Sequence, residues 1–341
     1  MISKQTNHFN QLIDSYIISV HTCLSQKNPP SPQDVSYKAL VRMNCEDEPE
    51  NGEKKRQDRL VAKSGKMGYE HVLGYNRNNP SKISFCQFST NNYSINDDTT
   101  EVDKLYINCD RDKIASISKE LMKAAKKSKT DITFKMTYED GISDNYKRAD
   151  NIVIYTESPE QKQRIVSMLT DIHDKNSKLF NPTKSLPFMP KIESAPYVCC
   201  CGPQKAGRYT SFKGLNSPSK IIHNTWNAKM AEVLQESLAF AVNIVAKGCY
   251  APFNPSNPNT LPASEHIKNC SSEYLLMSDE QKSQVQALMQ TTILSLCQKN
   301  DITIDTALIP QKSITNDLSS KIEPNPTYTQ SAKSRSEDLI I

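Results

Sequence analysis

The chain has 341 residues, a formal net charge of +4 and an apolar fraction of 37%. This length allows one large domain or two modest ones. The low apolar fraction, with many Asn, Ser, Thr, Gln and Lys residues, indicates that part of the chain is loop or tail. The small net charge gives no support to a nucleic-acid-binding function. No run of 18 or more apolar residues occurs, so we expect no membrane span, and we expect no signal peptide.

The first 44 residues predict a helix that docks on a core. After a polar start, apolar residues fall on one helical face, namely Phe9, Leu12, Ile13, Tyr16, Ile17 and Val20. A proline-rich break at 28–32 separates this helix from a short helical or extended piece at 35–43. We expect residues 1–27 to be dispensable for folding of the core. Residues 45–66 mix acidic and basic runs and predict a charged, solvated linker.

The main domain is expected over residues 67–310. Residues 69–75 and 83–88 predict two strands joined by a turn. A strand at 104–109, a helix at 112–127 and a strand at 132–138 follow, because apolar residues change from a period of two to helical spacing and back. A further strand at 151–155 leads into a helix at 161–173.

The rest of the chain continues this mixture. A strand is expected at 197–201, a Gly/Ser-rich basic loop at 202–219, a long helix at 221–246, an extended loop at 251–261 and an amphipathic helix at 279–299. Residues 311–341 predict a disordered tail. The fold class expected is α+β: a twisted, mostly antiparallel sheet with helices packed on one face, plus N- and C-terminal helical additions.

The ten cysteines are expected to be free thiols rather than disulfides or metal ligands. Most are scattered through apolar or strand-like contexts, where buried thiols are common. Cys199, Cys200 and Cys201 are adjacent, so on a strand they alternate sides and cannot all reach one metal. No Cys-x-x-Cys pair accompanies them. We therefore expect no metal site and no cofactor.

Cationic and aromatic residues form the one pattern that indicates chemistry, since no Walker, GxGxxG, HExxH or GxSxG motif occurs. Lys104 and Tyr106 share one face of a strand, and Lys135 is central in another. Further cations are expected to contribute to phosphate binding, namely Arg148, Arg208, Lys213 and Lys220. Gathered on one concave sheet face, with a helix N-terminus near Ser219, these groups would attract phosphate or carboxylate. The alternative is a solvated, lysine-rich strand face.

At these residues the chain resembles the HopA-type family of type III secretion effectors, whose domain is also known in lyase candidates of class V lanthipeptide biosynthesis. The matching pattern runs from Lys104-Leu-Tyr-Ile-Asn108 through a helix with Leu121 to the strand around Phe134-Lys-Met136. It continues with Arg148-Ala-Asp150, Val153-Ile-Tyr155 and a helix, then Pro187 and Ser211-Phe212 before a long helix. The resemblance covers roughly 69–247, about half of the chain.

That family is distantly similar to the OspF/SpvC phosphothreonine lyases, which carry a Lys-x-His strand followed by a lysine-bearing strand. Lys104 matches the first lysine, Lys135 loosely matches the second, and Tyr106 stands where the lyases have histidine. The resemblance implies Lys104, Tyr106 and Lys135 as catalytic residues. Tyrosine is a weaker general acid at neutral pH, because its usual pKa is near 10.

Two functions follow as expectations. The first is a bacterial effector, made in the bacterial cytoplasm and delivered by a type III system into a host cell, that eliminates phosphate from phosphoserine or phosphothreonine. The second is a non-enzymatic effector that binds a host protein or a secretion chaperone. The chaperone is expected at the N-terminal region, where the Ser/Asn/Gln-rich start fits a secretion signal. Balanced charge and a single tryptophan disfavour nucleic acid as a partner.

Overall fold

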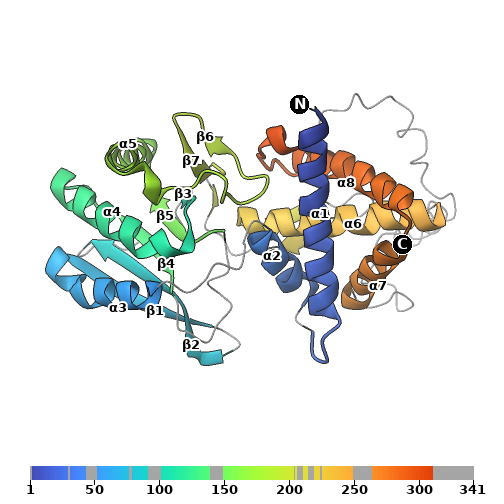
Figure 1. The fold of residues 1–341 in the computed structure, drawn as a ribbon, viewed down its shortest axis with the longest axis horizontal. Coiled ribbons are helices and arrows are strands. Elements are labelled where there is room, and N and C mark those ends of the chain that lie inside the picture. Colours follow the sequence, from blue (N-terminus) through green and yellow to red (C-terminus); the bar gives the residue numbers. More distant parts are fainter. Residues whose placement is uncertain are drawn as a thin grey trace, which may run out of the picture. The chain divides into compact units, whose positions relative to one another are not determined.

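A mostly antiparallel sheet organises the first part of the chain (Figure 1). The computed structural model describes residues 2–29, 31–43, 52–76, 79–90, 101–138, 149–202, 204–205, 210–213, 219–222, 225–248 and 263–309. The sheet path is β1-β2-β4-β5-β3-β7-β6, and all neighbours on it are antiparallel. Its strands are β1 Tyr69–Asn76, β2 Asn79–Thr90, β3 Glu101–Ile107, β4 Thr133–Thr137, β5 Ile152–Thr156, β6 Lys191–Ile192 and β7 Ala195–Cys200, while β8 Gln204–Lys205 pairs with β3.

Two crossover units interlock within this sheet. β3 and β4 are both antiparallel to β5, so they are parallel to each other, and α4 (Ile114–Ser128) joins them. In the same way α5 (Pro159–Lys175) joins the parallel strands β5 and β7 across β3. This β-α-β-β-α-β order with split crossovers is the ferredoxin-like arrangement. It confirms the α+β fold class and the predicted order of these strands and helices.

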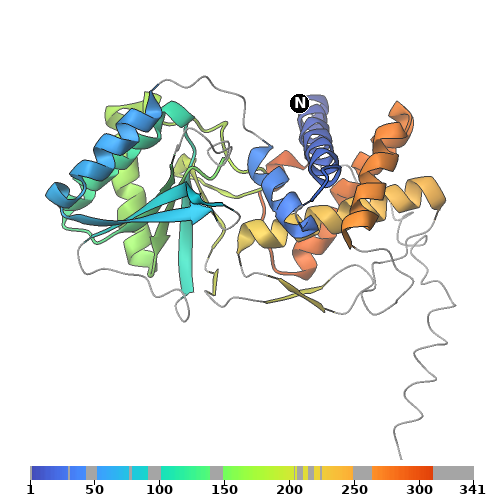
Figure 2. The same ribbon diagram turned by 90° about the horizontal axis from the view of Figure 1, so that it is seen from below.

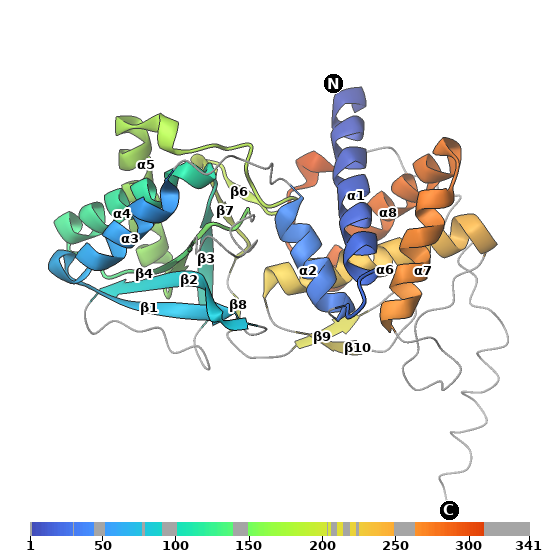
Figure 3. The same ribbon diagram turned by 60° about the horizontal axis from the view of Figure 1, so that its bottom comes forward.

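One face of the sheet is covered by α3 (Glu53–Lys63), α4 and α5, as Figures 2 and 3 show. The side chains that point to this face form an apolar core with the two crossover helices. Leu105 and Ile107 of β3 and Phe134 and Met136 of β4 have no exposed surface. The period of two along each strand therefore sends these residues to the helices and sends their neighbours to the opposite face.

Four further helices of the described chain build a second core around α6 (Trp226–Lys247). They are α1 Ile2–Leu24, α2 Pro32–Arg42, α7 Ala263–Leu276 and α8 Asp279–Lys299, and every residue of α6 from Trp226 to Asn243 except Lys229 is buried. A helix buried all round is typical of a core position. Apolar residues of α1, among them Ile13, Ile17 and Val20, have no exposed surface in this core. This burial argues against the expectation that residues 1–27 are dispensable for folding, which a deletion would test.

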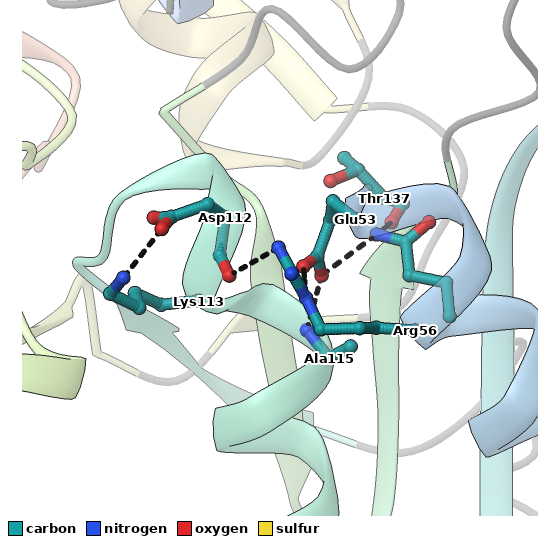
Figure 4. Close-up of polar contacts among 7 residues, drawn as sticks. Glu53, Arg56, Asp112, Lys113, Ala115 and Thr137 are labelled. Atoms are coloured by element: carbon teal, nitrogen blue, oxygen red, sulfur yellow. Dashed lines mark hydrogen bonds and ion pairs between the residues drawn. The ribbon is translucent and has the colours of Figure 1, made fainter. Parts of the chain in front are cut away.

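The predicted charged linker at 45–66 contains a helix, which corrects the expectation of a solvated loop. α3 buries Glu53, Gln57 and Leu60. Glu53 accepts a hydrogen bond of 2.6 Å from the backbone N–H of Ala115, at the start of α4, and one of 2.8 Å from Arg56 Nε (Figure 4). The buried carboxylate therefore satisfies an N–H group that α4 itself leaves without a partner.

Several other boundaries differ from expectation. The predicted helix at 221–246 begins only at Trp226, capped by Thr225, because Ser219–Ile222 forms strand β10 with β9 (Thr210–Lys213). β8 and β9 lie within the segment at 202–219 that was expected to be a loop. α7 has no counterpart among the predicted elements, whereas α8 has the predicted bounds. The tail expected at 311–341 and the loop expected at 251–261 lie outside the described residues.

The cysteines confirm the expectation of buried free thiols. Of the eight that the structure describes, seven are buried and Cys23 is partly exposed. Burial raises the pKa of Cys199 to about 11 and that of Cys201 to about 12. Among the described residues, no group of His, Cys, Asp and Glu side chains could hold a metal ion. No helix described in the structure is long and apolar enough to cross a membrane.

Candidate functional site

The three residues predicted to be catalytic lie on the sheet face opposite to α3, α4 and α5. Lys135 of β4 is aligned with Val153 of β5, and Val153 is aligned with Tyr106 of β3. Residues aligned across neighbouring strands share a face. A strand spacing of about 4.8 Å places the Cα atoms of Lys135 and Tyr106 roughly 10 Å apart. Lys104 lies two residues before Tyr106 and shares the same face, so the structure brings these three residues together.

Both lysines of this group lie over aromatic rings. Lys104 Nζ is 5.7 Å from the ring centroid of Tyr155, with which Lys104 is aligned across β3 and β5. Lys135 Nζ is 5.5 Å from the ring centroid of Phe85 on β2. The two lysines are partly exposed. Such contacts stabilise the charged ammonium by the negative face of the ring, so this part of the sheet face carries two cations.

Tyr106, in contrast, is sealed inside the protein. Its side chain is only 4% exposed and packs in the core built around α6. Burial, followed by the nearby Cys201 and Asp150, holds the pKa of Tyr106 well above its usual value of 10. The phenol therefore stays protonated at neutral pH, and very little of it is accessible to solvent.

Asp150 adds a negative charge close to Tyr106. Asp150 is 4% exposed and accepts a hydrogen bond of 3.3 Å from Asn227 Nδ2 in the first turn of α6. The preceding residue, Ala149, donates its backbone N–H to the carbonyl oxygen of Val41 at the end of α2, at 2.8 Å. These bonds join the start of β5 to the helices.

The predicted phosphate-binding residues are placed only in part. Arg148 and Arg208 lie outside the described residues. Lys213 and Lys220 lie on β9 and β10, where Lys213 is aligned with Ser219 and Lys220 with Phe212. These two strands form a two-stranded sheet of their own. The structure therefore does not test whether these four cations join Lys104 and Lys135.

Sequence reasoning missed the roles of Tyr155 and Phe85 as partners of the two lysines. The sequence did contain a signal for Tyr155, because Tyr155 lies two residues after Val153 on a predicted strand and so shares its face. Phe85 also lay in a predicted strand, but its position beside Lys135 depends on the pairing of β2 with β4. The burial of Tyr106 had no local signal, since the helices that cover it are distant in sequence.

The solved structures similar to this chain include two effector proteins of Pseudomonas syringae. The first, from pathovar tomato strain DC3000, is 12% identical over 78% of this chain and 95% of that chain, with a TM-score of 0.39. The second, from pathovar syringae strain 61, is 11% identical over 79% and 92% of the two chains, again with a TM-score of 0.39. At these values neither likeness carries an argument about fold or function. No family model and no curated protein matches the chain.

Proposed function

We propose that this chain is a bacterial effector, exported by a type III system, that acts in a host cell by binding a protein partner. The sequence pattern that resembles HopA-type effectors supports this proposal, and it extends over elements from β1 to α6. The choice of binding over catalysis rests on one observation, the burial of Tyr106. A secretion chaperone at the N-terminal region is part of the same proposal.

The burial of Tyr106 matters because elimination of phosphate needs two groups at the substrate. A base must remove the proton on the α-carbon, and an acid must assist the oxygen that leaves with the phosphate. The side chain of Tyr106 is only 4% exposed, and burial holds its pKa well above the usual value, so it is a poor candidate for the acid. Lys135, the candidate base, would have to act as a neutral amine, whereas its position over Phe85 favours the charged form.

A phosphoserine or phosphothreonine lyase is the second candidate, favoured by the shared face of Lys104, Tyr106 and Lys135. In this reaction Lys135 takes the α-proton, the electron pair forms a carbon–carbon double bond, and the carbon–oxygen bond to phosphate breaks. Lys104, which is partly exposed, would stabilise the leaving oxygen in place of Tyr106. Arg148, with Lys213 or Lys220 and Arg208, would hold the phosphate.

The experiment that separates the two functions mixes the purified full chain with a phosphopeptide library. Mass spectrometry then looks for peptides that have lost about 98 Da, as elimination of phosphoric acid requires. If the chain only binds a partner, no such product forms. Cross-linking in host extract should then recover the same unmodified host protein in repeated experiments. A product that disappears in Lys135→Ala, at an unchanged melting temperature, would establish the lyase and overturn our choice. Lys126→Ala, an exposed lysine of α4, is the matched control.

A further inference from the structure

A lysine-lined groove lies between α4 and α5, on the far side of the sheet from Tyr106. It has a volume of about 500 Å³. Four of the residues that line it are lysines, Lys119, Lys123, Lys127 and Lys175, while Glu120 is the one acidic residue among the lining residues. Its floor is apolar, since Ile172 and Leu179 belong to the core between the helices and the sheet. The groove thus combines positive walls with an apolar base.

Three of these lysines have no ion pair within the described part of the chain. Lys123 Nζ is 2.7 Å from Glu120 Oε1, and both side chains are well exposed. Lys119, Lys127 and Lys175 have no carboxylate partner among the residues described in the structure. The groove therefore has a net positive charge that nothing in the described structure neutralises, and it attracts an anionic ligand.

The helix dipole accounts for only two of the four lysines that line the groove. Lys127 and Lys175 lie in the last turns of α4 and α5, where a positive charge offsets the negative end of the helix dipole. Lys123 pairs with Glu120 within α4, and this pair supports the helix. Lys119 lies in the middle of α4, where neither the dipole nor an ion pair among the described residues offsets its charge. Lys119 is therefore the lysine of the groove whose charge is most open to an anionic ligand.

The spacing of the α4 lysines indicates the shape of that ligand. Lys119, Lys123 and Lys127 are four residues apart, so they recur about every 6 Å along the helix. In an extended chain, side chains two residues apart point the same way and recur about every 6.6 Å. A carboxylate at every second residue of an extended segment therefore matches the lysines along α4.

We propose that the groove between α4 and α5 binds an extended acidic segment of a partner protein, with carboxylates at alternate residues. This inference rests on the proposed function, because it names the chemistry of the protein partner. The proposal also predicts how Glu120 affects binding. Glu120 repels an acidic ligand and is paired with Lys123, so Glu120→Gln should raise the affinity for the acidic segment.

The test uses the full chain and a fluorescein-labelled peptide in which glutamate alternates with serine over seven residues. A peptide of the same composition, with its glutamates in one block, is the comparison. Anisotropy should show weaker binding of the block peptide. Lys119→Glu with Lys127→Glu should weaken binding of the alternating peptide about tenfold or more, and Glu120→Gln should tighten it roughly twofold or more. Lys126→Glu, with a change of charge on the same helix but outside the groove, should alter it less than about twofold.

Three results would overturn the groove proposal. The first is equal affinity for the alternating and block peptides, and the second is a loss in Lys126→Glu as large as in the double variant Lys119→Glu with Lys127→Glu. The third is tighter binding of single-stranded DNA that the same groove variants abolish, which would assign the groove to nucleic acid. Capture of the cross-linked host protein by the groove variant as well as by the unmodified chain would reject the groove and leave the proposed function standing. Peptide binding in a chain that captures no host protein would reject the proposed function instead.

Discussion

The buried carboxylate of Glu53 provides the sharpest test of how the charged segment before β1 is held. In Glu53→Ala, the backbone N–H of Ala115 loses its acceptor at 2.6 Å, and Ala115 is buried. An unsatisfied buried N–H costs about 1–3 kcal/mol. Loss of a negative charge at the start of α4 costs a further ~0.3–1 kcal/mol. The side chain of Arg56 is 39% exposed, so water can replace its hydrogen bond to Glu53 in the variant. The ion pair between Arg56 and Glu53 therefore adds little to the free energy lost.

We therefore expect Glu53→Ala to lower the free energy of unfolding by about 2–3 kcal/mol. For a chain of this size that corresponds to a fall in melting temperature of about 3–4 °C, measurable by circular dichroism. Glu53→Gln keeps an oxygen acceptor for Ala115 but loses the charge, and should cost about 1 kcal/mol.

Glu120→Gln is the matched control for Glu53→Ala. Glu120 lies on α4 and also pairs with a basic residue, but its side chain is 41% exposed. It should change the free energy of unfolding by less than about 0.5 kcal/mol. If Glu53→Ala melts at the same temperature as Glu120→Gln, the contact between α3 and the start of α4 does not hold α3 in place, and the reasoning from Figure 4 fails.

Three further predictions concern other parts of the chain. Deleting residues 1–24 should prevent cooperative unfolding of the helical core, and a sharp, unchanged thermal transition would contradict this. Gly74→Ala should cost about 1–3 kcal/mol in urea unfolding, because a Cβ at this position overlaps the ring of Phe85; no loss would show that the ring moves freely. The pKa values of Cys199 and Cys201 are raised in the folded chain to about 11 and 12, so folding binds protons above pH 9. Stability should hold from pH 7 to about 8.5 and fall by about 1.4 kcal/mol per thiol at pH 10, and equal urea midpoints at pH 7.5 and 10 would refute this.

Elements with strong local patterns could be predicted from the sequence. The α8 helix begins after Ser278, whose side chain and that of Gln281 cap each other's backbone N–H groups, and its bounds are as expected. The alternation along β3, β4 and β5 also fixed which residues share a face. α7 was missed although Ile267, Cys270 and Tyr274 recur at helical spacing and are buried.

Errors arose where distant residues decide the structure. Ile221 and Ile222 continue the helical spacing of α6, but they pair with Ser211 and Thr210 in a hairpin. α3 has few apolar residues, and its place depends on the contact between Glu53 and Ala115, 62 residues apart in sequence. Local patterns cannot contain such contacts.

In the candidate site, too, some features follow from local sequence patterns and others depend on residues distant in sequence. Alternation placed Lys104 and Tyr106 on one face, and the pairing of β3, β5 and β4 then added Lys135. What covers that face could not be foreseen, because Tyr106 belongs to a core cluster that also includes residues of α1, α2, α6, α7 and α8, far from it in sequence. The sequence therefore contained no information on whether a predicted catalytic side chain such as that of Tyr106 is exposed to solvent.

The helical core also sets an order of events during synthesis. Ser36 of α2 donates a hydrogen bond to Gln235 of α6, and these residues are 199 positions apart. α1 and α2 leave the ribosome first, yet their apolar faces stay uncovered until α6 has been made. The interlocked β-α-β units between them are complete earlier, because their contacts are nearer in sequence. A protein that binds the uncovered face of α1 in this interval would keep the helical core open while the sheet folds.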